Sequence, residues 1–175
     1  MICGSCGHDN LQGEDVCQEC GQDLGGFDLP APTNEVEHSL MQDPVSRLSP
    51  PQALTIDVGA TAGEAIRRLY EIKKGALLVT RDGSLAGIFT ERDVLKKLAG
   101  LPADPATTSL ESVMTANPAT VRSTDTIALA LNRMYIGGYR HLPVVDGPGQ
   151  IAIISVKDIL RYFAQFFEST AAPAS

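Results

Sequence analysis

The sequence contains no tryptophan, and aromatic residues make up only 5% of its 175 positions. Apolar residues nevertheless reach 43%, which suffices for a sizeable core in one or two domains, and that core must be aliphatic. No stretch approaches the roughly 20 consecutive apolar residues of a membrane span. The N-terminus also lacks the basic and apolar regions of a signal peptide. We therefore expect a cytoplasmic protein with no membrane partner.

Basic residues are missing from the first quarter of the chain. Residues 1–46 contain nine Asp and Glu but no Lys or Arg, whereas residues 47–175 contain twelve acidic and fourteen basic side chains. The net charge of −7 therefore belongs to the N-terminal segment. Because a nucleic-acid-binding surface normally neutralises phosphates with Lys and Arg, nucleic acid is an unfavoured partner.

The four cysteines all lie in the first twenty residues. They form two Cys-x-x-Cys pairs, each followed by glycine: Cys3, Cys6, Cys17 and Cys20. Two tight turns of this kind direct four sulfurs at one ion, so the spacing predicts a structural Zn²⁺ site in a ribbon over residues 1–24. The ion would supply most of the folding energy of so short a segment. Two disulfides or a redox pair are the alternatives. His8 is a spare ligand that a complete Cys₄ shell does not need. The segment resembles the zinc-ribbon family.

From residue 55 onward the sequence repeats itself at a constant offset of 65 without a gap. The matched pairs include Thr55/Thr120, Ala65/Ala130, Arg68/Arg133, Tyr70/Tyr135, Leu77/Leu142, Val79/Val144, Ile88/Ile153, Thr90/Ser155, Asp93/Asp158 and Leu95/Leu160. Two copies are too few for a solenoid. They predict a pseudo-symmetric pair.

Each copy follows one pattern of elements. Short extended pieces at 55–58 and 120–122 precede helices, the first opened by a Thr61–Glu64 capping box. Strands follow at 76–80 and 85–89 in the first copy and at 142–145 and 150–154 in the second, joined by glycine-containing turns. A last helix begins at Glu91 or Val156. The fold class is therefore α/β, two β-α-β-β-α repeats that share a core.

The end of the third strand carries a hydroxyl–x–x–Asp motif in both copies, Thr90 to Asp93 and Ser155 to Asp158. The hydroxyl and the free N–H groups of the first helical turn can hold a phosphate. The Asp lies on the same helix face, where its carboxylate can accept both hydroxyls of a ribose. An acidic capping box without a ligand is the alternative, but the motif recurs in register, which favours a function.

Residues 87–95, 139–146 and 154–160 together resemble the cystathionine β-synthase (CBS) domain family. The resemblance covers roughly residues 40–167 and implies a tandem pair, often called a Bateman module. It implies AMP or ATP bound in a cleft between the copies, a flat homodimer, and non-catalytic allosteric control of an unidentified partner protein. The resulting division is a ribbon at 1–24, a linker at 25–39 with a short helix started by Thr33 or Asn34, repeats at 40–100 and 101–167, and a disordered tail at 168–175.

The resemblance also implies the roles of particular residues. Asp93 and Asp158 would bind ribose, and Thr90 and Ser155 would bind phosphate. Arg140 and His141 occupy a phosphate-contacting position in the second copy, where the first has Gly75 and Ala76 after Lys73 and Lys74. Ser49 and Thr115 are candidate partners of the opposite site. The site with Asp158 is therefore better equipped than the site with Asp93.

The remaining side chains suggest little chemistry. His141 could act as a base, but the sequence places no Ser or Cys nucleophile beside it, so we expect no enzyme. We expect Tyr70, Tyr135 and Tyr139 to be packing residues. The last helix is rich in phenylalanine, which fits either the core or a dimer contact: Phe163, Phe166 and Phe167. A nucleic-acid-associated regulator that uses the ribbon is the second hypothesis.

Overall fold

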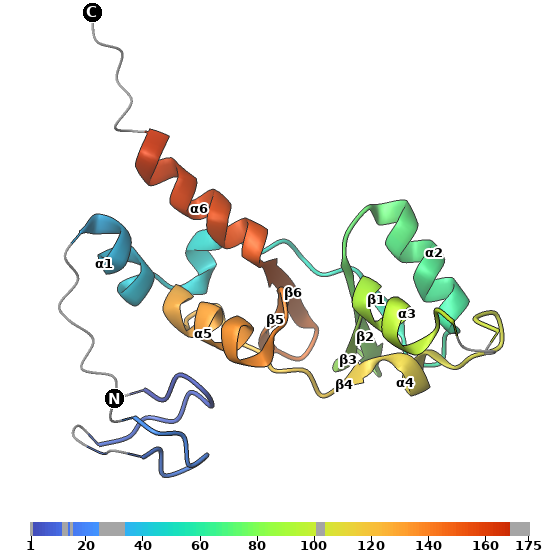
Figure 1. Cartoon of the computed structure of the whole chain (residues 1–175), viewed down its shortest axis with the longest axis horizontal. Coiled ribbons are helices and arrows are strands. Elements are labelled where there is room, and N and C mark those ends of the chain that lie inside the picture. Colours follow the sequence, from blue (N-terminus) through green and yellow to red (C-terminus); the bar gives the residue numbers. More distant parts are fainter. Residues whose placement is uncertain (1, 12–13, 15, 25–33, 101–103, 169–175) are drawn as a thin grey trace, which may run out of the picture. The chain divides into compact units, whose positions relative to one another are not determined.

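The computed structural model describes residues 2–11, 14, 16–24, 34–100 and 104–168. The predicted linker at 25–32, Thr33 as a helix start, and the tail from 169 onward lie outside these residues. The chain divides into two compact units (Figure 1). Unit 1 contains residues 1–50, 121–142 and 154–175, and unit 2 contains residues 51–120 and 143–153. Among the described helices, none combines the length and the apolar character needed to cross a membrane.

Unit 2 is built on a four-stranded sheet with the order β1-β2-β3-β4. The strands are β1 (Thr55–Asp57), β2 (Ala76–Arg81), β3 (Ser84–Thr90) and β4 (Thr115–Ala116). β1 runs parallel to β2, and the other pairs are antiparallel. Asp82 and Gly83 both adopt positive φ, at 50° and 77°, which is the backbone of a tight two-residue hairpin turn.

Both faces of β2 are buried, because its apolar residues alternate between two clusters. Leu77 and Val79 face a cluster shared with α2 (Ala62–Ile72), α3 (Glu91–Lys97) and α4 (Leu110–Val113). Leu78 faces a second cluster that includes Ile151 and Val145 from the second repeat. The prediction of a core shared by the two repeats is therefore confirmed within unit 2.

Unit 1 contains α1 (Glu35–Gln42), the 3₁₀ helix η1 (Val45–Leu48), α5 (Ile127–Gly137) and α6 (Val156–Glu168). It also takes one end each of β5 (His141–Gly147) and β6 (Gln150–Ser155), which pair as a two-stranded sheet. α1 packs against α5, and η1 lies beside α6 (Figure 1). Asn34 caps α1 by accepting a hydrogen bond from the N–H of Glu37, as the sequence predicts.

The repeated β-α-β-β-α pattern of each copy is packed against the residues that lead into the pattern of the other copy. We call these the leading segments: residues 34–50, ahead of Thr55, and residues 104–119, ahead of the matching Thr120. In the first leading segment, the Val45 N–H donates to the Asp125 carbonyl at 2.7 Å. In the second leading segment, the Leu110 N–H donates to the Ala60 carbonyl at 3.0 Å. The leading segments are therefore exchanged between the repeats, which the sequence does not reveal.

The repeated helices and strands lie within a few residues of their predicted bounds, but other expectations are wrong. Residues 120–122 form no strand and contain only a bridge at Val121. Tyr70 and Tyr135 are 85% and 87% exposed, so they are not packing residues. The apolar stripe of α2 buries Leu69, and the next residue points about 100° away from it. η1, α4 and β4 are not predicted.

Candidate functional site

The hydroxyl–x–x–Asp motif adopts the same geometry in both repeats. Thr90 ends β3 and caps α3, and its backbone N–H and hydroxyl donate to Asp93 Oδ2 at 2.9 and 2.7 Å. Ser155 ends β6, and its N–H and hydroxyl donate to Asp158 Oδ2 at 2.8 and 2.6 Å. In both repeats, therefore, Oδ2 of the aspartate helps to start a helix. The surroundings of the other oxygen, Oδ1, differ between the two repeats.

The backbone beside the motif is also repeated. In the first repeat the Glu91 N–H donates to the Gly75 carbonyl at 3.3 Å, and in the second the Val156 N–H donates to the Arg140 carbonyl at 3.1 Å. Gly75 and Arg140 are separated by the sequence offset of 65. The second repeat thus places an exposed arginine next to its helix start, at the position where the first repeat has glycine.

Asp93 is buried, and both of its carboxylate oxygens have hydrogen-bond donors within the protein. Its Oδ1 accepts a hydrogen bond from the Thr115 hydroxyl at 3.2 Å and forms an ion pair with Lys97 Nζ at 2.9 Å. Only 7% of the residue is exposed. Thr115 belongs to the second leading segment, so the structure brings this predicted residue of one repeat to the Asp of the other.

Asp158 is more open. Its Oδ1 contacts Arg161 at 3.1 Å, and the Arg161 side chain is 78% exposed. The Asp158 side chain itself is 20% exposed, compared with 9% for Asp93. A ligand could therefore displace the Arg161 contact at little cost, since exposed ion pairs contribute only about 0–1 kcal/mol.

Both Asp carboxylates are ionised well into the acidic range. Burial alone would raise the pKa of Asp93, but hydrogen bonds from Lys97 and Thr90 lower it below the ordinary value. Burial would likewise raise the pKa of Asp158, and hydrogen bonds from Ser155 together with the Arg161 charge lower it. Each carboxylate is therefore an acceptor at neutral pH, as ribose hydroxyls require.

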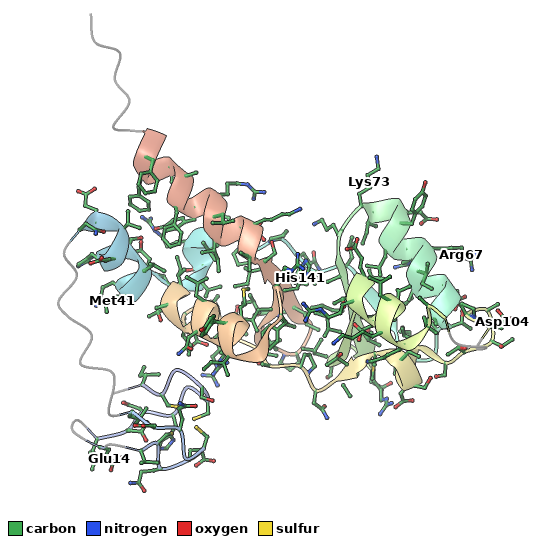
Figure 2. All side chains as sticks on the ribbon, in the orientation of Figure 1. Glu14, Met41, Arg67, Lys73, Asp104 and His141 are labelled. Atoms are coloured by element: carbon green, nitrogen blue, oxygen red, sulfur yellow. The ribbon has the colours of Figure 1, made fainter. Side chains whose placement is uncertain are left out.

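The other predicted residues of the second site also lie in unit 1. Arg140 is exposed, and the half-buried His141 begins β5 (Figure 2). Ser49 adopts a left-handed conformation with φ of 49° at the end of η1, which packs against α6. Lys97 is the functional residue that sequence reasoning missed, although an i, i+4 pair with Asp93 was a usable signal.

The four cysteine sulfurs form one cluster, all within 4.8 Å of one another. The Sγ atoms of Cys3 and Cys20 are 3.6 Å apart, and those of Cys6 and Cys17 are 3.5 Å apart. A metal about 2.3 Å from four thiolates holds them roughly 3.8 Å apart. All four cysteines are free, so the disulfide alternative is wrong in this structure, and the cluster can hold a metal ion.

The two cysteine turns share one backbone pattern, which explains the convergence of the sulfurs. The Gly7 N–H donates to the Cys3 carbonyl, and the Gly21 N–H donates to the Cys17 carbonyl, both at 2.9 Å. Both glycines adopt positive φ, at 77° and 71°. The buried Asn10 joins the turns by accepting a hydrogen bond from the Gln18 N–H at 3.0 Å.

Comparison with known proteins matches the repeats. The family model described as CBS domain matches residues 38–100 and 110–165. The CBS domain-containing protein CBSCBSPB5 of Arabidopsis thaliana is 40% identical over 118 residues, which cover 66% of this chain and 21% of the relative. The chain thus spans about a fifth of the length of these curated Arabidopsis relatives.

Solved structures match the same part of the chain. A CBS-domain containing protein from Agrobacterium tumefaciens is 32% identical with a TM-score of 0.62, and the match covers 68% of this chain and 95% of that one. A CBS domain protein from Pyrobaculum aerophilum, complexed with AMP, is 23% identical with a TM-score of 0.63 and covers 74% of this chain and 99% of that one.

Proposed function

The chain belongs to the CBS-domain family, and from that premise we propose that it is a regulatory protein that binds an adenine nucleotide such as AMP or ATP and controls a partner protein in response. The observation that carries the proposal is the repeated carboxylate–hydroxyl turn, in which Asp158 Oδ1 pairs with the exposed Arg161. The AMP complex of the Pyrobaculum aerophilum protein supports the choice of ligand.

In the proposed complex, Asp158 accepts hydrogen bonds from the ribose hydroxyls after Arg161 moves aside. The phosphate lies against the Ser155 hydroxyl and the N-terminus of α6, where the helix dipole favours an anion. Arg140, just before β5, supplies positive charge; His141 at the start of β5 and Ser49 at the end of η1 are further candidate contacts. A nucleotide that binds one arrangement of the protein more tightly than another shifts the population toward it, which is the basis of control.

The division of the chain proposed for this function follows from the sequence. The repeats occupy residues 40–100 and 101–167, and residues 1–24 form the ribbon. We propose that the ribbon holds one structural Zn²⁺ on Cys3, Cys6, Cys17 and Cys20, because four cysteines at this spacing are typical zinc ligands. The ion would fold the ribbon, because the apolar core among its described residues consists of three cysteines and Leu24.

We also propose a homodimer formed through the helices of the repeats. Both repeats expose large apolar side chains at matched positions, Tyr70 and Tyr135 on α2 and α5, and Leu95 and Leu160 on α3 and α6. Exposed apolar side chains of this size, gathered on helices, commonly mark an interface. Sedimentation velocity should show a dimer that Tyr135→Asp converts to monomer. A monomeric wild-type protein would refute this part of the proposal.

Isothermal titration of the zinc-loaded protein with AMP, ATP and NAD tests the nucleotide proposal. We expect saturable binding of AMP or ATP. The full-length, folded protein should be used, with its melting curve recorded before and after ligand addition, since a ligand that binds the folded state raises the melting temperature. No heat and no shift at millimolar nucleotide would overturn the proposed function.

A further inference from the structure

The two repeats differ at one position that controls the surroundings of the ribose-binding carboxylate. Four residues after the Asp, the first repeat has Lys97 and the second has Tyr162, which the offset of 65 makes equivalent. On a helix, residues four apart lie on one face. The side chain at this position can therefore either cover the carboxylate or turn away from it.

In the first repeat the side chain covers the carboxylate. Lys97 Nζ lies 2.9 Å from Asp93 Oδ1 and also donates to the carbonyls of Val113 and Met114 at 2.8 and 2.9 Å. These carbonyls belong to the end of α4 and the residue after it, so the ammonium is held by three acceptors. An ammonium has three protons to donate, and each of them points to one of these three acceptors.

Asp93 is correspondingly saturated. A carboxylate offers about four lone-pair positions, and Asp93 accepts from the Thr90 N–H, the Thr90 hydroxyl, the Thr115 hydroxyl and Lys97. A ribose could bind this carboxylate only by displacing Lys97 or Thr115. Displacing Lys97 would also strip the α4 carbonyls of their donor.

In the second repeat the equivalent side chain turns away. The Tyr162 hydroxyl donates to Asp43 Oδ2 at 2.5 Å and lies 3.0 Å from the buried Ser39 hydroxyl. Ser39 and Asp43 belong to the first leading segment. The tyrosine therefore ties α6 to that segment, as Lys97 ties α3 to the second leading segment, but it places no cation on Asp158.

We propose that Lys97 is an internal plug that keeps the first repeat from binding nucleotide, so that the chain has one nucleotide site, at Asp158. This inference rests on the proposed function, because it concerns which of the two carboxylates takes the ribose. It assigns the blocked first site to Lys97, because the Thr90 and Ser155 turns are alike whereas the groups that contact Oδ1 of Asp93 and Asp158 differ.

The test measures AMP stoichiometry and affinity in four full-length proteins: wild type, D158A, K97M with D158A, and K96M with D158A. Lys96 is an exposed neighbour on α3, so its replacement removes the same charge without opening Asp93. We expect wild type to bind one AMP per chain and D158A to lose that binding. K97M should restore a site in the D158A background, within about tenfold of wild-type affinity, and K96M should not.

Each result separates the inference from the function that it rests on. If wild type binds two AMP per chain, or if K97M restores no binding in the D158A background, the plug is refuted while nucleotide binding stands. If wild type binds no nucleotide, both the proposed function and the blocking role of Lys97 are refuted. Restoration by K97M but not by K96M supports the plug.

A folding control is needed because Lys97 also bonds the α4 carbonyls. Lys97→Gln keeps an N–H donor for Val113 or Met114 but removes the charge, so it should open the site with less loss of packing. Urea unfolding followed by circular dichroism identifies variants that fold. If the Met variant does not fold, the Gln variant carries the test, and its failure to bind AMP in a folded D158A background refutes the plug.

Discussion

Replacing each Asp of the repeated motif by alanine should separate ligand binding from stability. In the proposed complex Asp158 accepts two ribose hydroxyls and gives up its contact with the exposed Arg161. Hydrogen bonds to a charged group contribute about 1.5–3 kcal/mol each, and the lost surface pair about 0–1 kcal/mol. D158A should therefore weaken AMP binding by about 2–6 kcal/mol, or roughly 30-fold to 25,000-fold.

D93A should have the opposite profile. Asp93 is buried and accepts two bonds that start α3, one bond from Thr115 and the Lys97 ion pair. Losing the helix-start bonds costs about 0.5–2 kcal/mol and losing the Thr115 bond about 0.5–1.5 kcal/mol. The half-exposed Lys97 adds little. Stability should fall by about 1–3.5 kcal/mol in total, and AMP affinity should stay within about threefold of wild type.

Titration calorimetry with AMP and urea unfolding followed by circular dichroism measure the two quantities on the same protein preparations. The reasoning is refuted if D93A weakens AMP binding as much as D158A does. It is also refuted if D158A costs more stability than D93A, because the more exposed carboxylate would then be the structural one.

Three further changes test other parts of the structure. Cys17→Ser should reduce the zinc content measured by mass spectrometry and leave the urea unfolding midpoint of the repeats unchanged. A lower unfolding midpoint of the repeats would show that the ribbon does not fold separately from them. Gly87→Ala should cost about 1–3 kcal/mol, because its new Cβ would lie 2.9 Å from the Thr115 carbonyl; unchanged stability in urea would contradict the β3–β4 packing. Tyr162→Phe should cost about 1 kcal/mol at pH 7 and raise the pKa of Asp43, which hydrogen bonds from Ser39 and Tyr162 now lower. The stability that the ionised Asp43 gains from this bond is fully present above the ordinary Asp pKa of about 3.9. It is lost as the pH falls through the lower pKa of Asp43 in the folded protein. If wild type and Tyr162→Phe differ in urea stability by the same amount at pH 6 and pH 3, the bond to ionised Asp43 is refuted.

The sequence predicts the repeated elements well because local signals define them. The Thr61–Glu64 capping box and the Asp82-Gly83 turn both appear as predicted. Because the copies repeat at an offset of 65, an element predicted in one copy also predicts the matching element in the other. The short α4 and β4 give no such signal, since four and two residues are too few to show a period.

The candidate site is only partly visible in the sequence, because the decisive contacts join distant residues. The pairing of Thr115 with Asp93 follows from the β3–β4 register, which no local pattern encodes. The role of Lys97 depends on the carbonyls of α4, sixteen and seventeen residues away. The sequence predicts Tyr70 and Tyr135 as packing residues, yet their helices turn them to solvent.

The exchange of leading segments has a consequence for synthesis of the chain on the ribosome. Pro44 forms a bridge with Thr126, a partner made about 80 residues later, which takes about 4–16 s at ordinary elongation rates. During that interval the apolar Val45, fully buried in the folded protein, has no place to pack. The first leading segment therefore cannot complete its packing while the second repeat is still being made, and Val45 stays unburied on the nascent chain until then.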